Sequence, residues 1–180
     1  MSRKERANPY QLSLNLTEHK NQARYTINPA EWTEQDGLSR FTYAIQEEIR
    51  ILSPADAATY LLQSVYAPFE AMDQEELWVL LLNHKQHMTH TTMVYRGNIN
   101  SVVLRPAELF KEAVRFNAPS IILSHCHPSG DPTPSPEDVQ ITATLVEAGR
   151  LLHIRILDHI IVGDNCWISL HETGATQFGS

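Results

Sequence analysis

Cysteine and long hydrophobic runs are scarce in this sequence. Its 180 residues include two cysteines, Cys126 and Cys166, which stand far apart and form no CxxC pair, so neither a disulfide framework nor a cysteine-rich zinc knuckle is indicated. The longest apolar run, Leu77 to Leu82, is far too short to cross a bilayer, and the polar residues 2–6 are not followed by the apolar stretch of a signal peptide. We therefore expect a cytoplasmic protein without a membrane segment, in which any metal has nitrogen and oxygen ligands.

Positive charge is also scarce. The chain has 14 Lys and Arg against 21 Asp and Glu, a formal net charge of -7. Affinity for duplex DNA is carried largely by Lys and Arg that displace counterions, so broad attraction to nucleic acid is not expected. The length and the hydrophobic content of 42% fit one globular domain.

The N-terminal part gives weak structural signals. A faint alternation of apolar residues over 10–16 favours an edge strand, and a partly amphipathic pattern predicts a short helix around Leu38 to Leu52. Clear signals begin at Ser53, an N-cap residue followed by Pro54 at the first helical position. We accordingly divide the chain into an N-terminal extension over 1–52, a domain over 53–172 and a C-terminal tail over 173–180.

Helices and strands alternate after Ser53. The expected elements are a helix over 53–66, strands over 77–82 and 88–95 joined by a hairpin at 83–86, a helix from Pro106 to Asn117, a strand over 120–124, a helix capped by Ser135, and strands over 154–162 and 166–170. This order predicts an α/β fold with a mixed β-sheet flanked by helices.

Two histidines mark the end of the strand over 120–124. His125 and His127 are two residues apart, so their side chains should project from one face, while Cys126 points to the other. Asp138 lies in the first turn of the next helix, and the turn residues between can fold its carboxylate back over the imidazoles. Two nitrogens and one oxygen leave the fourth tetrahedral position for water, as catalytic zinc sites require. By themselves, two histidines at this spacing also occur by chance.

The complete pattern is more specific. His-Cys-His-Pro-Ser-Gly at 125–130, with Ser135 and Asp138, matches the H-x-H-x7-S-x-x-D signature, and the chain resembles the JAMM (MPN-plus) metalloproteases. It is most similar to the RadC group, from about Ser53 to Leu170. The resemblance is supported by YRGNIN at 95–100, RPAE at 105–108 and LDHIIVG at 157–163.

The resemblance implies an MPN/JAB fold, a three-layer architecture like that of cytidine deaminases, and one zinc ion per chain held by His125, His127 and Asp138. The sequence departs from the RadC pattern at Cys126, where RadC proteins usually have Asn. Since this side chain should face away from the metal, we expect ligation to be undisturbed. Full-length RadC proteins also carry a helix-hairpin-helix module, of which the N-terminal extension shows no sign.

JAMM enzymes add an upstream glutamate at the start of a strand, and Glu75 and Glu76 are the candidates. Counting back from the strand end at Asn83 favours Glu75, although both residues would also suit a solvated loop. In the implied mechanism, zinc lowers the pKa of its water to about 7, and the glutamate takes the proton and later donates it to the leaving amine. Ser135 would donate a hydrogen bond to the oxyanion, although its hydroxyl also suits the helix N-cap.

Other polar residues have simpler interpretations. His84, His87 and His90 are three apart, but their segment is a predicted hairpin, so we do not expect them to bind metal. Asp158 and His159 would either support the metal ligands from behind or form a buried structural pair. Cys166 and Trp167 are expected in the core. A Ser-His-Asp triad built on Ser135 is disfavoured, because no Gly-x-Ser-x-Gly elbow surrounds it.

Three functions compete. The complete ligand set favours a zinc-dependent metallopeptidase or isopeptidase with a peptide or protein substrate. The alternative is a DNA repair or nucleic-acid processing factor, a role attached to the RadC name. Because the chain has an excess of acidic residues, we expect any contact with nucleic acid to be made through partner proteins. A non-catalytic MPN scaffold normally goes with a broken ligand set, which is whole here. The sequence does not identify the substrate, and it is compatible with a homodimer.

Overall fold

One mixed sheet runs through the centre of the molecule, in a computed structural model that describes residues 12–13, 34–35, 38–39, 41–45, 48–97 and 104–178. Its seven strands lie in the order β1-β9-β8-β7-β5-β6-β4, and β7 and β8 are the parallel pair. The strands are β1 (Leu12–Ser13), β4 (Phe41–Ala44), β5 (Glu76–Leu82), β6 (Met88–Arg96), β7 (Ser120–Cys126), β8 (Arg155–Gly163) and β9 (Cys166–Ser169), and β2 (Glu34–Gln35) and β3 (Leu38–Ser39) pair separately.

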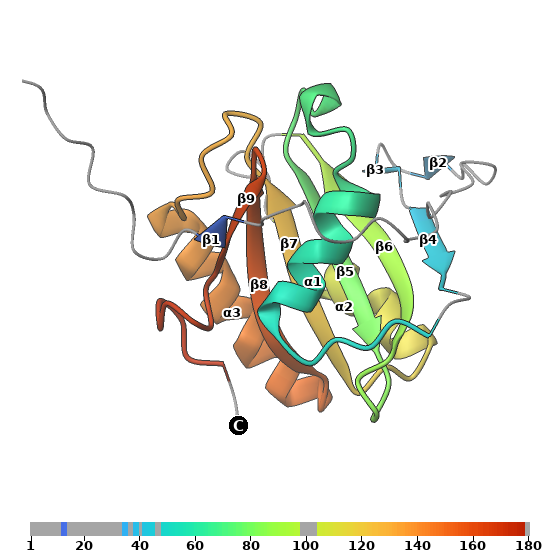
Figure 1. Ribbon diagram of the computed structural model, residues 1–180. Coiled ribbons are helices and arrows are strands. Elements are labelled where there is room, and N and C mark those ends of the chain that lie inside the picture. The colour runs from blue at the N-terminus through green and yellow to red at the C-terminus, as the bar shows by residue number, and fades with distance from the viewer. Residues whose placement is uncertain are drawn as a thin grey trace, which may run out of the picture.

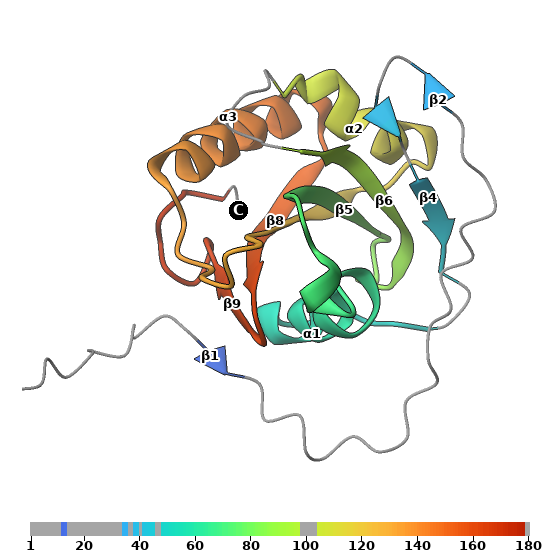
Figure 2. The ribbon, with the colours of Figure 1, turned by 90° about the horizontal axis from the view of Figure 1, so that it is seen from above.

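Helices cover both faces of this sheet. Helix α1 (Pro54–Tyr60), which continues as a π-helical turn over Leu61–Val65, lies on one face, and α2 (Pro106–Arg115) and α3 (Pro136–Leu152) lie on the other (Figures 1 and 2). A short 3-10 turn, Phe69–Ala71, precedes β5. The predicted α/β fold with a mixed sheet flanked by helices is therefore confirmed.

Alternation along β5 builds the two hydrophobic cores. Leu77, Val79 and Leu81 belong to the core beneath α2 and α3, whereas Trp78, Leu80 and Leu82 belong to the core beneath α1. A strand that is buried on both faces has apolar residues at every position, which explains the long apolar run of β5 in the sequence. Burial of each such side chain stabilises the fold by about 1.5–3 kcal/mol.

Capping boxes start both α1 and α3. The hydroxyl of Ser53 accepts from the Asp56 amide and that of Ser135 accepts from the Asp138 amide, while each aspartate accepts from its cap residue in return. Each cap stabilises its helix by about 1 kcal/mol. The cap of α3 also places the Asp138 side chain in a defined position at the start of the helix.

The helix predicted around Leu38 to Leu52 is wrong. Residues 41–44 form β4, which pairs antiparallel with β6, and Arg50 forms an isolated bridge with His87. Phe41, Thr42 and Tyr43 are of types that favour strands, and β6 offers them an edge for backbone pairing. Of the edge strand expected over 10–16, Leu12 and Ser13 pair with β9, and the other residues lie outside the described parts.

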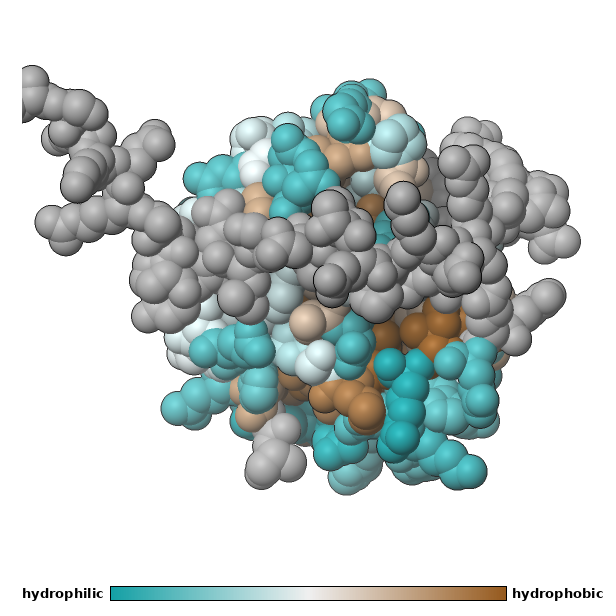
Figure 3. All heavy atoms as spheres, in the orientation of Figure 1, coloured by the Kyte–Doolittle hydropathy of each residue, from teal (hydrophilic) through white to brown (hydrophobic). Residues whose placement is uncertain are grey.

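On the face that carries α1, hydrophilic side chains predominate, and hydrophobic ones gather towards the lower right of the view (Figure 3). Within the described ranges, no helix has the length and apolar character needed to span a membrane.

Candidate metal centre

The carboxyl end of β7 meets the first turn of α3 at one end of the sheet. His125 lies inside β7, between Leu77 of β5 and Ile161 of β8, because the strand runs two residues beyond its predicted end. The residue is 1% exposed. Cys126 belongs to the core beneath α1, so the predicted opposition of these two neighbours is confirmed.

His125, His127 and Asp138 converge at this end of the sheet. The Nε2 atoms of the two histidines are 2.9 Å apart, and the Asp138 carboxylate lies 3.3 Å from Nε2 of His125 and 3.7 Å from Nε2 of His127. A tetrahedral zinc ion with ligands at 2.0–2.1 Å holds their donor atoms about 3.3 Å apart. The three residues therefore lie close enough to hold a metal ion, and they form the only such group in the part of the chain that the structure describes.

The orientation of His127 also suits a ligand. Its Nδ1 lies 2.8 Å from the carbonyl oxygen of Asp131, which can only accept a hydrogen bond. Nδ1 therefore carries the hydrogen, and in the neutral ring the lone pair is on Nε2, the atom that faces His125 and Asp138. The loop between β7 and α3 thus contributes a backbone contact that presents this imidazole to the site.

The electrostatics of the cluster favour an ionised carboxylate. Burial by itself would raise the pKa of Asp138, but its contacts with the imidazoles of His125 and His127 and with the hydroxyl of Ser135 hold that pKa well below its ordinary value. Burial would likewise lower the pKa of His127, but its bonds to Asp138 and Asp131 raise it. Asp138 is consequently a carboxylate at neutral pH and attracts a cation.

Glu75 and Glu76 have different environments. Glu76 is 8% exposed, and its carboxylate accepts from Trp78 Nε1 at 2.9 Å and lies 3.4 Å from Nε of Arg96. Glu75 is half-buried, and its charge is the smallest of the influences that raise the pKa of His127, after the bonds to Asp138 and Asp131. Glu76 is therefore committed to a structural ion pair, and Glu75 acts electrostatically on the cluster.

The hydroxyl of Ser135 is fully used by the helix cap. Its oxygen accepts from the Asp138 amide at 3.1 Å, and its O–H donates to Oδ2 of Asp138 at 2.7 Å. The backbone amide of Ser135 donates to the same carboxylate oxygen at 2.8 Å. Ser135 thus orients the aspartate that completes the cluster.

The remaining residues singled out in the sequence lie elsewhere or have structural partners. His90 stacks on Phe116 with ring centroids 3.8 Å apart, and His87 Nδ1 lies 3.6 Å from Glu48. Cys166 and Trp167 are buried. Asp158 accepts from Ser169 Oγ at 2.6 Å and from the backbone of His159 and His171, so it fixes the corner between β8 and the segment after β9.

His159 contacts the cluster directly. Its Nε2 lies 2.8 Å from Nδ1 of His125, and its Nδ1 lies 2.6 Å from the hydroxyl of Thr142. Sequence reasoning left its role open and missed Thr142 altogether. Thr142 stands four residues after Asp138 in α3, a spacing that places two side chains on one helix face and is the signal that could have found it.

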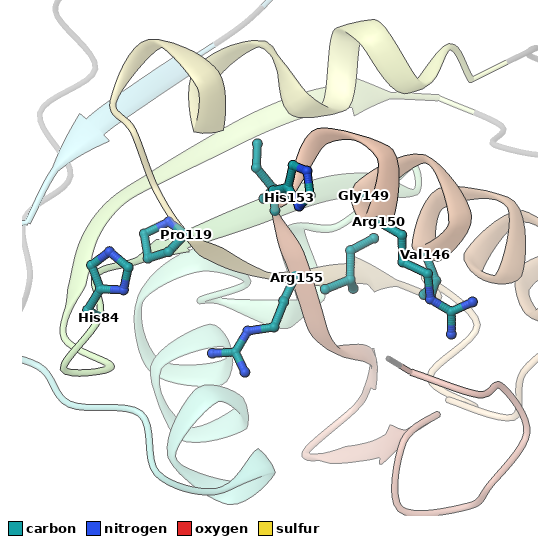
Figure 4. Close-up of a pocket in the computed structure, with 9 residues that line it drawn as sticks. His84, Pro119, Val146, Gly149, Arg150, His153 and Arg155 are labelled. Atoms are coloured by element: carbon teal, nitrogen blue, oxygen red, sulfur yellow. The ribbon is translucent and has the colours of Figure 1, made fainter. Parts of the chain in front are cut away.

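A separate pocket of about 680 Å³ lies at the other end of β7. Four basic residues contribute to its lining, but the guanidinium groups of Arg150 and Arg155 point in different directions (Figure 4), and Arg150 is paired with Glu147. These side chains therefore do not converge on one point. The lining residues are His84, Pro119, Val146, Gly149, Arg150, His153, Ile154, Arg155 and Ile156.

Comparisons with known proteins agree on one family. A family model described as a RadC-like JAB domain matches residues 51–175. A UPF0758 protein of Chloroflexus aurantiacus is 50% identical over 131 residues, which are 73% of this chain and 56% of the relative. Proteins of the same name from Roseiflexus castenholzii and Bacillus cereus are 44% and 45% identical over 129 residues, covering 72% of this chain and 54% and 56% of the relatives. The chain thus spans about half the length of these relatives, whose name states no activity.

Proposed function

The chain belongs to the RadC-like JAB domain family, and from this premise we propose that it is a zinc-dependent hydrolase of peptide or isopeptide bonds. The observation that carries the proposal is the convergence of two imidazole nitrogens and one carboxylate at the spacing of metal ligands. Nitrogen donors favour zinc over magnesium or calcium, which prefer sites made of oxygen ligands. We assign His125, His127 and Asp138 as the ligands of one zinc ion per chain.

A bound zinc ion would lower the pKa of a coordinated water to about 7 and polarise the substrate carbonyl. The residues around it must then accept a proton, deliver it to the leaving amine and stabilise the oxyanion. Three protein ligands leave room for water and substrate, as catalytic zinc sites do.

Glu75 is our candidate for the proton transfers. Its charge acts on His127, whereas the carboxylate of Glu76 is held by Trp78 and Arg96. As a carboxylate, Glu75 would accept the proton of the attacking water. In its protonated form it would donate that proton to the leaving amine, so the two steps balance.

Ser135 is our candidate donor to the oxyanion. It has one hydroxyl proton, which lies towards Oδ2 of Asp138 in this structure. Donation to substrate requires rotation of this proton away from Asp138, while the hydroxyl oxygen still accepts from the Asp138 amide. The hydroxyl can therefore accept in the helix cap while it donates to the oxyanion, but it cannot donate to Asp138 and to the oxyanion at the same time.

The proposal is tested with the whole chain. The purified protein should contain about one zinc ion per chain by elemental analysis, and it should cleave members of a quenched-fluorescent peptide or isopeptide library in a chelator-sensitive manner. A protein that takes up no zinc would refute the enzyme assignment. Zinc uptake without cleavage of any library member would favour a scaffold that binds partners.

A further inference from the structure

Two buried side chains stand behind the proposed ligands. The Thr142 hydroxyl donates to the backbone carbonyl of Asp138 at 2.6 Å and lies 2.6 Å from Nδ1 of His159. Nε2 of His159 in turn lies 2.8 Å from Nδ1 of His125. We propose that Thr142 and His159 are positioning residues that hold His125 in its metal-binding tautomer, an inference that rests on the proposed function.

The position of each hydrogen follows from the acceptors in the chain. The Asp138 carbonyl can only accept, so the single hydroxyl hydrogen of Thr142 points to it. The bond between Thr142 and His159 must then use a hydrogen on Nδ1 of His159. A hydroxyl with one hydrogen thereby determines the tautomer of the neighbouring imidazole.

The same reasoning continues to the ligand. The side chain of His159 is buried, and no carboxylate among the described residues bonds to its ring, so the neutral form is favoured. With its hydrogen on Nδ1, a neutral His159 presents a lone pair on Nε2, which must accept from Nδ1 of His125. The lone pair of His125 then lies on Nε2, the atom that faces His127 and Asp138.

The contacts form a relay that returns to its starting residue. It begins at the Asp138 carbonyl, passes through Thr142 and His159, and reaches His125, whose Nε2 lies 3.3 Å from the Asp138 carboxylate. Strand β7, strand β8 and helix α3 each contribute to it. The relay therefore sets both the separation of two ligands and the hydrogen on one of them. Such outer partners typically affect metal affinity 10–100-fold when they are removed.

Thr142 offers a matched pair of variants. Thr142→Val has nearly the shape of threonine but lacks the hydroxyl, while Thr142→Ser keeps the hydroxyl. In the zinc-free protein, nitrogen NMR of the histidine side chains should show His125 protonated at Nδ1 in wild type and Thr142→Ser. Thr142→Val should show a mixture of tautomers, because nothing then determines the hydrogen on His159. An unchanged His125 tautomer in a folded Thr142→Val protein would overturn the relay.

Zinc affinity supplies an independent measurement. Against a zinc chelator, Thr142→Val and His159→Leu should bind zinc roughly 10–100-fold more weakly than wild type. Thr142→Ser should bind as wild type does, and His159→Gln should recover most of the affinity, because its amide offers an acceptor and a donor at a similar spacing. Equal affinities in all folded variants would refute the positioning role, whereas a wild-type protein without zinc would refute the proposed function itself.

Discussion

Nε2 of His125 and Nε2 of His127 lie 2.9 Å apart and face the same carboxylate, that of Asp138. Two nitrogen lone pairs at this distance repel each other unless a proton or a metal ion lies between them. The raised pKa of His127 also shows that this site favours a positive charge, since bonds to Asp138 and Asp131 outweigh the effect of burial. The site therefore attracts a positive charge, which the proposed zinc ion would supply.

We expect His127→Ala to abolish zinc binding, because two remaining protein ligands compete poorly with water. The measurement is zinc content after gel filtration, together with the melting temperature with and without chelator. Chelation should lower the melting temperature of wild type, since zinc stabilises only the folded chain. His84→Ala, at an exposed histidine in the β5–β6 hairpin, is the matched control and should retain zinc.

Glu75→Gln should retain zinc and lose hydrolysis, because an amide cannot accept the proton of the attacking water. The assay is cleavage of whichever library peptide the wild type cleaves, with zinc content measured on the same samples. Glu76→Gln is the neighbouring control, and it should stay active because its amide oxygen can still accept from Trp78. The opposite pattern of activity would transfer the role to Glu76.

Asp158 should make stability fall with rising pH. Burial raises its pKa, although bonds from Ser169, His171 and His159 oppose that rise. A pKa raised above the unfolded value of about 3.9 means that this residue's stabilising contribution is complete below that pH and is lost as pH rises through the folded-state pKa. Asp158→Asn should not show this loss.

The measurement is urea unfolding of wild type and Asp158→Asn from acidic to neutral pH. Asn can keep the two backbone donors on its oxygen and can donate to Ser169 from its amide. As pH rises, the unfolding free energy of wild type should fall relative to that of Asp158→Asn. A difference independent of pH would show that Asp158 titrates normally.

Cys126 should resist thiol reagents in the folded protein. Burial raises its pKa to about 12, so the reactive thiolate is scarce at neutral pH. Both cysteines are buried and should react with a thiol-specific chromogenic reagent only after denaturation. Rapid labelling of Cys126 in the native state, located by mass spectrometry, would show that the sheet opens on that face.

DNA binding should be weak and strongly salt-dependent, because 14 Lys and Arg oppose 21 Asp and Glu. The test is titration of labelled single- and double-stranded DNA at near-physiological salt, with and without zinc. Tight binding or cleavage that disappears in Asp138→Ala would favour a nucleic-acid processing function at the metal site. Binding that survives this change would indicate a separate basic surface.

Several elements could be predicted because their signals are local. Ser53 and Ser135 cap the helices that they were expected to cap. The boundaries were less accurate: β7 runs through Cys126 because β5 pairs with it as far as His125 and β8 pairs with it as far as Cys126. Residues 41–44 were misassigned because their strand exists only through its pairing with β6, which the segment's own periodicity does not report.

The sequence by itself determined the motif, the caps and the opposite directions of His125 and Cys126, because each depends on residues within a few positions of one another. The sequence already favoured Glu75 over Glu76, and the tertiary structure added the contacts of Glu76 with Trp78 and Arg96. The tertiary structure alone brought Thr142 and His159 behind the ligands. These residues come from α3 and β8, and their hydrogen bonds form only when the helix packs on the sheet, so no local pattern along the chain encodes them.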